Sequence, residues 1–398
     1  MPKRILIFST AYFPLVGGAE IAIKEITDRI NDIQFDMITL RFDGDLPEFE
    51  KVGNINVHRI GFTKKNPAMA DLVKFPLAFN KLFFPFTACF KACRLHRRNK
   101  YSAIWAMMAA YAGFAAMFFK AGHKRVPYLL TLQEGDPLEY IKRKVRFVGP
   151  LFKRIFTTAD FIQVISNYLA GLAREMGYQG GLEVIPNAVD IGHFTREYAA
   201  DDLAALKRKF GGSADDKYLI TASRLVLKNA VDDVIKALEY LPAGVKFLIL
   251  GAGPDEDDLK SLVKNLKLES RIFFLGQIGH KDLPKYLKIS DIFIRPSLSE
   301  GLGNSFLEAM AAGLPVIATP VGGIVDFLRD PSAGSGQATG LFCKVRDPKS
   351  IAEKVKVYLE NKELTEIIKI NAKSMVEKNY NWNLIAEKMK NIFNKLIK

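Results

Sequence analysis

The chain of 398 residues is long enough for two α/β domains, and its hydrophobic and charged fractions of 49% and 25% are ordinary for a soluble globular protein. Its three cysteines exclude a disulfide framework and lack the spacing of a zinc site. Its first ten residues lack the apolar core and cleavage site of a signal peptide. We therefore expect a cytoplasmic protein. The net charge of +14 implies an acidic partner, and because the sequence shows no nucleic-acid-binding motif, an anionic membrane is favoured over nucleic acid.

The first predicted strand and the first predicted helix are joined by a glycine pair. Residues Lys3–Ser9 are a short apolar run typical of a buried strand, and Ala19–Ile30 has helical periodicity. Gly17 and Gly18 lie between them, where outward-facing backbone N–H groups at the amino end of a helix would suit a phosphate. The loop is not a G-x-G-x-x-G dinucleotide fingerprint, so an ordinary turn and a phosphate-binding turn both stay open from these residues.

Strand-like runs recur along the first half of the chain, with helical segments between several of them. This alternation predicts a parallel, doubly wound sheet, whose further strands are Phe35–Leu40, Ile55–Ile60, Ala103–Met107, Tyr128–Leu132 and Phe161–Ile165. The uncharged run from Tyr101 to Phe119 is long enough to suggest a membrane span. Its small, turn-like residues 110–113 instead favour a strand followed by a buried helix.

Residues 75–98 combine aromatic and basic side chains. A helix starting at Pro85 would have one aromatic face, made of Phe86, Cys89, Phe90 and Cys93, and one basic face, made of Lys91, Arg94 and Arg98. A phenylalanine-rich face beside a basic one is the composition of a helix that lies in a membrane interface. The alternative is a helix packed on the sheet with a solvated basic flank, and from this segment the two interpretations are equal.

The positive charge is concentrated in the same part of the chain. Residues 60–155 contain 18 Lys and Arg against 4 Asp and Glu, whereas the rest of the chain contains 39 of each. A second basic cluster within this part consists of Lys142, Arg143, Lys144 and Arg146. It tips the interpretation towards contact with an anionic membrane surface.

A polar loop follows the predicted strand Tyr128–Leu132. It reads QEGDP, so Gln133, Glu134 and Asp136 lie at a strand's carboxyl end, where parallel sheets bind their ligands. The five histidines all lie outside recognisable site motifs; they are His58, His96, His123, His193 and His280. No histidine is therefore assigned to the candidate site.

The second half of the chain begins with a polar, charged connection, after which a strand starts at Tyr218. This strand ends at Ala222, and Arg224 and Lys228 lie in the loop before a helix that begins near Ala230. A basic pair at the carboxyl end of a parallel strand suits a phosphate, although such pairs also occur on ordinary surfaces.

A glycine-rich turn, GAGP, follows the next predicted strand, Val245–Leu250. The turn opens a helix whose first turn is acidic throughout, with Asp255, Glu256, Asp257 and Asp258. Acidic side chains there complement the helix dipole and would repel a phosphate. The sequence therefore predicts a structural turn at GAGP, followed by a further strand at Arg271–Leu275.

The most informative stretch is Asp291–Asp326. It predicts a parallel β/α unit made of a buried strand at Ile292–Arg295, a Pro/Ser/Gly loop, a helix from about Asn304 to Ala312, a strand at Pro315–Ala318 and a Gly-Gly turn. Ligands of such units bind where the strand's carboxyl end meets the helix's amino end. Glu300 in the loop and Glu308 in the helix flank this place with seven residues between them, so they could hold different parts of one ligand.

This stretch resembles a known family. The spacing of Glu300 and Glu308, the runs AMA at 309–311 and GLPVI at 313–317, and the Thr-Pro-x-Gly-Gly turn are together similar to the E-x7-E signature of retaining nucleotide-sugar glycosyltransferases of family 4. The resemblance implies the GT-B fold, an α/β fold with two Rossmann-like, doubly wound domains facing across a cleft. It covers nearly the whole chain but is weak between residues 42 and 100, where we expect acceptor specificity to lie.

The resemblance implies four parts of the chain. Residues 1–195 would form a Rossmann-like domain on the acceptor side, which is also the part with the possible membrane contact, and residues 196–216 the interdomain connection. Residues 217–378 would form a second Rossmann-like domain for the nucleotide-sugar donor. Residues 379–398 would form a C-terminal helix that crosses back to the first domain.

The resemblance also implies roles for individual residues. Arg224 and Lys228, on the donor diphosphate, and Glu300 would be the catalytic residues. The donor site would further include Gly17, Gly18, Gly303, Asn304, Ser305 and Glu308, the last of them on the ribose. A contact to the sugar or the acceptor would come from Gln133, Glu134 and Asp136, in a place where many relatives have a polar pair that includes a histidine.

The implied reaction is sugar transfer from a UDP- or GDP-sugar to a lipid-linked or glycan acceptor, in cell-envelope polysaccharide or glycolipid synthesis at the inner face of the membrane. The resemblance implies no metal and no cofactor, because cationic side chains would stabilise the leaving diphosphate. Two alternatives stay open: a non-catalytic scaffold with the GT-B fold, and a glycosyltransferase with a soluble acceptor. A dinucleotide-dependent oxidoreductase is disfavoured, because its fingerprint is absent from the sequence.

Overall fold

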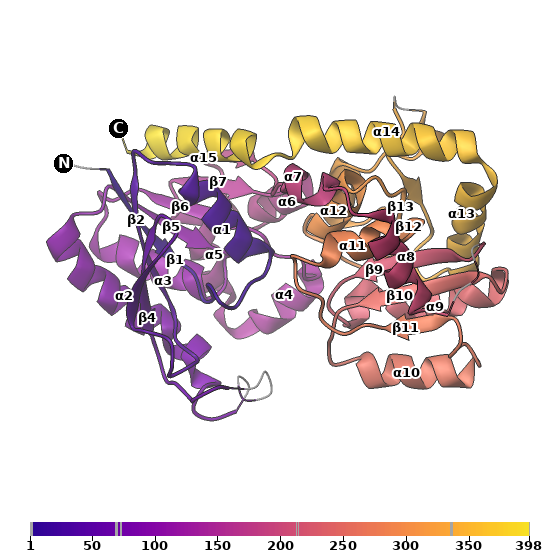
Figure 1. Cartoon of the computed structure of the whole chain (residues 1–398). Coiled ribbons are helices and arrows are strands. Elements are labelled where there is room, and N and C mark those ends of the chain that lie inside the picture. The colour runs from indigo at the N-terminus through magenta and orange to yellow at the C-terminus, as the bar shows by residue number, and fades with distance from the viewer. Residues whose placement is uncertain are drawn as a thin grey trace. The chain divides into compact units, whose positions relative to one another are not determined.

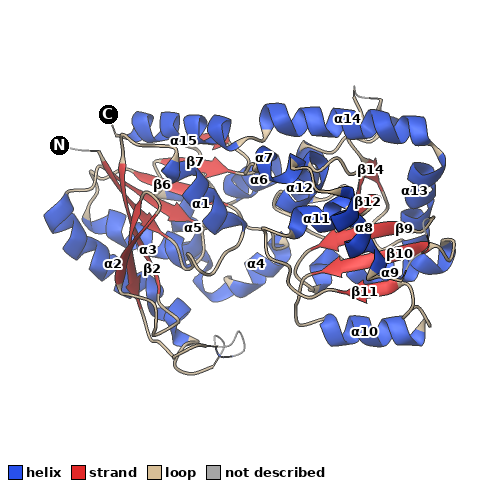
Figure 2. Ribbon diagram, viewed as in Figure 1, coloured by secondary structure: helices blue, strands red, loops and turns tan. Residues whose placement is uncertain are grey.

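The computed structural model describes residues 3–67, 71, 74–211, 213, 215–334 and 337–397. The chain forms two compact units, the first of Met1–Asn187 with Trp382–Lys398 and the second of Ala188–Asn381. Each unit has its own sheet with helices packed on it (Figures 1 and 2). The predicted α/β class with two doubly wound domains is therefore confirmed.

The first unit is built on a sheet of eight described strands in the order β3-β4-β2-β1-β5-β6-β7-β8. Neighbouring strands run parallel, except that β3 pairs antiparallel with β4 at one edge. The strands β5 and β6 are buried along their whole length, as apolar runs in a sheet covered on both faces should be. The strands are β1 (Arg4–Phe8), β2 (Gln34–Leu40), β3 (Phe49–Val52), β4 (Ile55–Ile60), β5 (Ala103–Met107), β6 (Tyr128–Leu132), β7 (Phe161–Val164) and β8 (Gly181–Val184).

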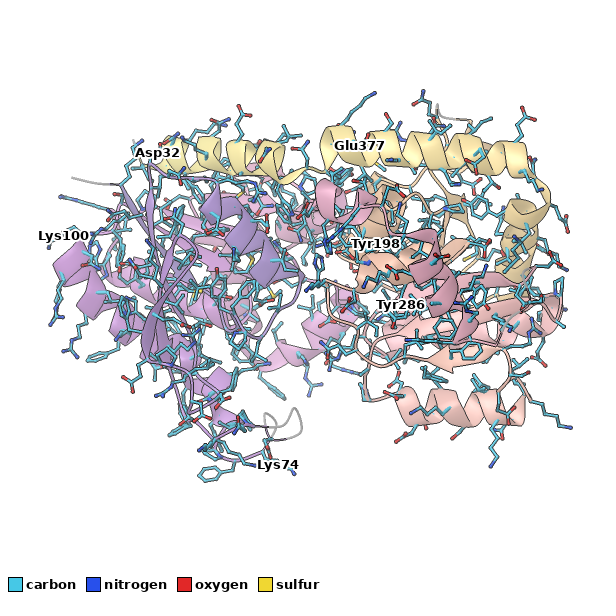
Figure 3. All side chains as sticks on the ribbon, in the orientation of Figure 1. Asp32, Lys74, Lys100, Tyr198, Tyr286 and Glu377 are labelled. Carbon is cyan, nitrogen blue, oxygen red and sulfur yellow. The ribbon has the colours of Figure 1, made fainter. Side chains whose placement is uncertain are left out.

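The helices of the first unit form two groups. In one, α2 packs on α3 and α3 packs on α5; in the other, α1 packs on α15. Phe393 of α15 joins the core, with its ring centroid 5.2 Å from that of Trp105, and Lys390 pairs at 2.8 Å with Asp32, which Figure 3 labels. The helices are α1 (Gly18–Asp28), α2 (Phe79–Asn99), α3 (Tyr111–Gly122), α4 (Leu138–Lys144), η2 (Arg146–Val148), α5 (Gly149–Thr157), α6 (Asn167–Glu175) and α15 (Trp382–Leu396).

The second unit is built on a parallel sheet of six described strands in the order β11-β10-β9-β12-β13-β14. The chain order differs from this spatial order, so β9 and β12 are neighbours although two strands separate them in sequence. The strands are β9 (Lys217–Ala222), β10 (Val245–Leu250), β11 (Ile272–Phe274), β12 (Ile292–Arg295), β13 (Val316–Ala318) and β14 (Leu341–Phe342).

Helices of the second unit bury their apolar faces on this sheet. Phe247 and Ile249 of β10 form one core with Val234 and Ile235 of α9 and with Val355 of α13, and all of them are fully buried. The helices are α7 (Ile191–Thr195), α8 (Ala200–Arg208), η3 (Leu227–Asn229), α9 (Val231–Ala237), η4 (Leu238–Tyr240), α10 (Glu256–Asn265), α11 (Leu283–Lys288), α12 (Asn304–Ala311), η5 (Gly322–Asp326), η6 (Pro331–Ala333), α13 (Pro348–Glu360) and α14 (Lys362–Asn379).

The units divide at different residues from those predicted. The first unit ends at Asn187, eight residues before the predicted boundary, and residues 196–216 belong to the second unit, where they include the helix α8. The physical reason is pairing within the second unit: Val189 forms a β-bridge with Asn381, and its N–H donates to the carbonyl of Tyr380 at 2.9 Å. Trp382, the first residue of α15, begins the part of the chain that returns to the first unit.

Two predictions about single segments can be judged directly. The run from Tyr101 to Phe119 forms the strand β5 and most of the helix α3, as expected, and no helix among the described residues is long and apolar enough to cross a membrane. The helix predicted to start at Pro85 starts instead at Phe79, with Pro85 buried inside it.

The earlier start of α2 changes which side chains share its exposed face. Phe83, Phe86 and Phe90 are exposed, whereas Cys89 and Cys93, which were predicted to lie beside them, are only half-exposed. The exposed face of α2 is therefore more aromatic than the sequence indicated.

Candidate active site

The loop after β9 contains both predicted cations. Arg224 is exposed, and within the described part of the chain its guanidinium makes no hydrogen bond or ion pair, so it remains available to a ligand. The loop is closed by the buried Asn229, whose Nδ2 donates to the carbonyl of Arg224 at 2.6 Å. This hydrogen bond holds the two ends of the loop together.

The GAGP turn supports this loop from behind. A side chain at Gly251 would place its Cβ 1.9 Å from the carbonyl oxygen of Ser223, and one at Gly253 would place it 2.1 Å from that of Leu225. The N–H of Leu225 donates to the carbonyl of Ala252 at 3.1 Å. The prediction of a structural turn is therefore confirmed, because the glycines allow two backbones to touch.

The loop after β12 holds Glu300 through a residue that the sequence analysis missed. Arg295, the last residue of β12, has a side chain that is 8% exposed and donates from Nη2 to Glu300 Oε2 at 2.8 Å. Its Nη1 donates to Ser305 Oγ at 2.8 Å, and its guanidinium lies 4.4 Å from the centroid of the Phe306 ring. Arg295 thus ties Glu300 to the first turn of α12, in a charge-assisted pair that orients the carboxylate.

The Gly-Gly turn after β13 is pressed against the backbone of Glu300. The N–H of Gly323 donates to the carbonyl of Glu300 at 3.0 Å. Gly322 has a φ of +55°, and a Cβ there would lie 1.9 Å from that same carbonyl oxygen. The Thr-Pro-x-Gly-Gly motif therefore fixes the position of Glu300 from the side opposite to Arg295.

Replacing Gly322 by alanine is expected to destabilise the protein and to lower its transferase rate. The left-handed conformation alone costs alanine on the order of 1 kcal/mol. The contact with a backbone oxygen adds to this, so the free energy of unfolding in a urea titration should fall by about 3 kcal/mol.

Gly313→Ala is the matched control for that variant. Gly313 also has a positive φ, +86°, but a Cβ there would meet nothing within 4 Å. We expect a loss of about 1 kcal/mol and an unchanged rate. Equal losses of stability and rate in the two variants would show that the contact with Glu300 does not matter.

The first turn of α12 carries the other predicted donor contacts. Gly303, with a φ of +92°, precedes the helix, and a Cβ there would collide with the Phe306 ring at 2.6 Å. Asn304 and Ser305 are the first helical residues, and the helix has no acidic residue in its first turn. The amino end of a helix without acidic residues in its first turn suits an anion.

Glu308 lies one turn further along α12, beside two histidines. Its side chain is 15% exposed, and its Oε1 lies 3.7 Å from Nε2 of His280. The ring of His193 in α7 stacks on that of His280, with centroids 4.9 Å apart, and its Nε2 contacts the His280 carbonyl at 2.8 Å. His280 thus lies next to Glu308, and His193 is connected to Glu308 only through His280, because α7 packs on both α11 and α12. The absence of a histidine with a role in the site stays a prediction.

The two loops of the second unit are joined directly. The N–H of Leu298, in the Glu300 loop, donates to the carbonyl of Lys228 at 2.7 Å. This bond follows from the parallel pairing of β12 with β9, which brings the carboxyl ends of the two strands together. The structure thus brings Arg224, Lys228, Glu300 and the start of α12 to one edge of the sheet.

The glycine loop of the first unit differs from the expectation in one respect. The N–H of Gly17 is not turned to solvent, because it donates to Oε2 of Glu20 at 2.8 Å in a capping interaction at the start of α1. Burial raises the pKa of Glu20, and this hydrogen bond opposes the shift. Gly17 therefore caps its own helix, and Gly18 opens the helix behind it.

The QEGDP loop is largely held by its own polar side chains. Gln133 exchanges two amide hydrogen bonds of 3.0 Å with Asn187, and Glu134 accepts from the N–H of Ala109 at 2.6 Å. Burial raises the pKa of Glu134. Two of the three predicted contact residues thus shape the end of β6, while Asp136 is exposed.

Known families match both halves of the chain. Residues 204–375 match the family described as Glycosyl transferases group 1, and residues 17–188 match the Glycosyl transferase 4-like domain. The chain belongs to the group 1 glycosyltransferases of family 4. It is a glycosyltransferase of the retaining hexosyltransferase type, and the resemblance seen in the sequence is confirmed.

Several curated proteins are similar to this glycosyltransferase. It is 24% identical over 411 residues to an uncharacterized glycosyltransferase of Methanocaldococcus jannaschii, with 98% of this chain and 97% of the relative covered. It is 29% identical over 333 residues to the alpha-monoglucosyldiacylglycerol synthase of Acholeplasma laidlawii, with 79% of each covered. It is 28% identical over 251 residues to a GDP-mannose-dependent monoacylated alpha-(1-6)-phosphatidylinositol monomannoside mannosyltransferase of Corynebacterium glutamicum, with 60% of this chain and 63% of the relative covered.

Solved structures confirm the fold of this glycosyltransferase. Sucrose-phosphate synthase from Thermosynechococcus elongatus is similar with a TM-score of 0.79 at 21% identity, over 99% of both chains. Anabaena HepE in complex with UDP-glucose is similar with a TM-score of 0.78 at 20% identity, over 98% of this chain and 99% of that one. The predicted GT-B fold is therefore confirmed.

Proposed function

We propose that this glycosyltransferase moves a sugar from a UDP- or GDP-sugar to a lipid-linked acceptor, in cell-envelope polysaccharide or glycolipid synthesis at the cytoplasmic face of the membrane. The observation that carries the reaction is the junction of the Arg224–Lys228 loop with the Glu300 loop through Leu298. It assembles cations, a carboxylate and a helix start at one sheet edge, which is the set of groups that a nucleotide diphosphate sugar needs.

The main catalytic demand is to stabilise the leaving diphosphate. Arg224 and Lys228 meet this demand as cations, together with the N–H groups at the start of α12. The exposed, unengaged guanidinium of Arg224 supports this role, since a structural arginine would have partners in the chain. Metal is not required for charge stabilisation of this kind.

The two glutamates take different parts of the donor. Glu308 accepts the hydrogen bonds of the ribose hydroxyls, and Glu300 acts at the transferred sugar. The arginine partner of Glu300 supports its role, because a carboxylate that pairs with Arg295, on a backbone held by the Gly322 turn, loses little freedom when the sugar binds. From the first unit, Gly18 and Asp136 contribute contacts to the donor or acceptor, and Gly17, Gln133 and Glu134 hold the loops that carry them.

A lipid acceptor is supported by relatives and by the surface of the first unit. The name of the Acholeplasma relative describes the synthesis of a glucosylated diacylglycerol, and the name of the Corynebacterium relative describes a mannosyltransferase for a monoacylated phosphatidylinositol monomannoside. In this chain, Phe86 and Phe90 of α2 are 62% and 75% exposed, and the surplus of basic residues lies in the same region. Exposed aromatic and basic side chains together suit a membrane interface.

The test of the reaction is a transfer assay with a panel of UDP- and GDP-sugars, against glycolipid acceptors in vesicles and against soluble sugars. We expect transfer to a lipid acceptor from one nucleotide class, and the product anomer, read by NMR, should match the donor. Donor hydrolysis without transfer to any acceptor would contradict the proposed lipid acceptor. The absence of both hydrolysis and transfer would favour the non-catalytic scaffold. Transfer to soluble sugars alone would favour the second alternative, a soluble acceptor.

The membrane part of the proposal predicts the behaviour of the α2 basic residues. Changing Lys91, Arg94 and Arg98 to serine should weaken co-sedimentation with anionic vesicles by on the order of a hundredfold, because each basic residue contributes about 1 kcal/mol at such a surface. Binding should also fall with added salt, since exposed charges are screened. If the unaltered protein does not bind anionic vesicles at low salt, the proposed membrane attachment is contradicted.

A further inference from the structure

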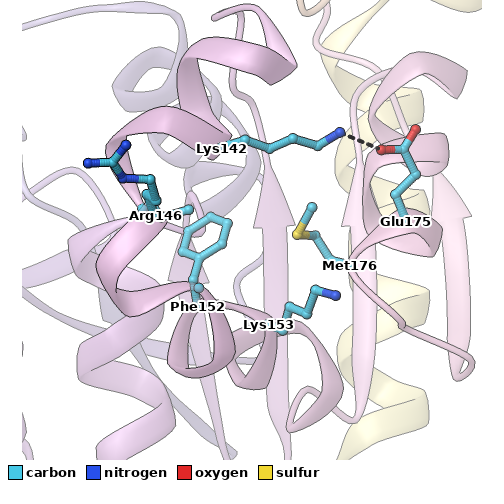
Figure 4. A pocket seen from close by; sticks show the side chains of 8 residues that line it. Lys142, Arg146, Phe152, Lys153, Glu175 and Met176 are labelled. Carbon is cyan, nitrogen blue, oxygen red and sulfur yellow. Dashed lines mark ion pairs between the residues drawn. The ribbon is translucent and has the colours of Figure 1, made fainter.

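The first unit has a concave feature that none of the predicted site residues lines. It is a hollow of about 410 Å³ between α4, η2, α5 and the end of α6. Figure 4 shows the side chains that line it, and those that matter here are Lys142, Arg146, Phe152, Lys153, Glu175 and Met176. Its floor is apolar and most of its rim is cationic.

The charges around this hollow favour an anion. Lys142 lies 3.7 Å from Glu175, the one acidic side chain that lines the hollow (Figure 4). Arg146 and Lys153 form no ion pair within the described residues, so two positive charges remain uncompensated. Gly149, the first residue of α5, also lines the hollow, and the first turn of α5 has no acidic residue to offset its dipole.

Residues that alternate in sequence with those lining the hollow expose apolar side chains to solvent. Phe147 is 86% exposed, and the guanidinium of Arg146 lies 4.7 Å from its ring centroid. Val148 and Leu151 beside it are also exposed. Three exposed apolar residues within one short segment, next to uncompensated cations, are the composition of a membrane-interface contact.

A series of ring contacts connects the hollow with α2. Phe152 in the hollow lies 6.3 Å from Phe114, Phe114 lies 6.3 Å from Phe118, and Phe118 stacks at 5.4 Å on the exposed Phe86, all measured between ring centroids. All but Phe152 are at least partly exposed. A series of packed rings therefore links the hollow with the aromatic face of α2.

We propose that this hollow binds the phosphate headgroup of an anionic phospholipid, with Arg146 and Lys153 on the phosphate and Phe147 inserted among the acyl chains. The proposal rests on the membrane attachment in the proposed function and names the lipid class and the residues that hold it. A bilayer lipid is the occupant, because a soluble phosphate would make no contact with the exposed apolar side chains beside the hollow. The bound lipid would orient the first unit on the membrane with the α2 face towards the bilayer.

The experiment compares vesicle binding of the intact protein and three variants, using phosphatidylcholine vesicles with and without phosphatidylglycerol. Arg146→Gln/Lys153→Gln should weaken binding to the anionic vesicles about 20-fold, and salt should reduce this difference. Phe147→Ser should weaken binding severalfold at any salt concentration, since its contribution is apolar. The matched control is Lys51→Gln/Lys65→Gln, which also removes two exposed positive charges. These charges lie beside the β3–β4 edge of the sheet, whereas α6 packs on β7 and β8 at the other edge.

The control decides between a binding site and general attraction of a basic surface. A loss of less than about threefold in the control, beside the larger loss in the Arg146/Lys153 variant, supports the headgroup site. Equal losses of vesicle binding in both double variants overturn the proposal. Binding of inorganic phosphate by a protein that does not bind vesicles overturns it as well. Hydrolysis of the nucleotide sugar in vesicle-free solution should be unchanged in all variants, so that a failed headgroup site is distinguished from a failed catalytic assignment.

Discussion

Alanine at Arg224 or at Lys228 is expected to lower kcat about a hundredfold, the loss typical of removing one group that stabilises developing negative charge. The thermal midpoint of the Arg224→Ala protein should be unchanged, because the Arg224 side chain is exposed and without partners among the described residues. Rates measured under saturating donor, together with thermal melts, check both statements.

The double variant separates a shared role from two independent ones. If both cations act on one diphosphate, the double variant should lose less than the product of the two single losses. Lys264→Ala, which removes an exposed cation from the last turn of α10, is the matched control and should transfer at the normal rate. Normal transfer by both single variants, together with early melting, would make Arg224 and Lys228 structural residues.

The local parts of the site could be predicted from the sequence, because each is a short apolar strand followed by a glycine- or serine-containing loop and a helix. The strand before Arg224, the helix of Glu308 and the turn at Gly322 all lie where the pattern indicated. Their junction could not be predicted from the pattern alone. It depends on β9 being next to β12, and two strands of the same sheet, β10 and β11, separate them in sequence.

The residues that sequence reasoning missed were of two kinds. Arg295 had a usable signal, since a charged residue that ends the apolar run Ile292–Ile294 must find a partner if the strand is buried, and Glu300 follows in the next loop. His193 and His280 had no signal of this kind, because they are 87 residues apart and only the packing of α7 on α11 brings them together.

Helix α2 shows a different limit. Proline is common in the first turn of a helix, so the pattern placed the start at Pro85 and left the preceding residues out. In the structure the helix starts at Phe79 and tolerates Pro85 within it. The exposed face is consequently richer in phenylalanine than predicted, which supports the proposed membrane contact.

Replacing Glu308 by glutamine is expected to weaken nucleotide binding by at least about tenfold, since a hydrogen bond to a charged acceptor contributes about 1.5–3 kcal/mol. The carboxylate accepts from two hydroxyls at once, whereas the amide offers one acceptor oxygen. The change keeps the shape of a side chain that is only 15% exposed, so stability should change little. Calorimetric titration with UDP and GDP measures the effect.

His280→Gln is the matched control for this variant, because it removes the imidazole that lies 3.7 Å from Glu308 and leaves the carboxylate in place. We expect its nucleotide affinity to stay within about threefold of that of the unaltered protein, since an exposed partner of a carboxylate contributes little. A tenfold loss in His280→Gln with none in Glu308→Gln would transfer the role from the carboxylate to the imidazole. Equal affinity in all three proteins would remove the ribose contact from Glu308 and leave Glu300 as the only carboxylate proposed to hold the donor.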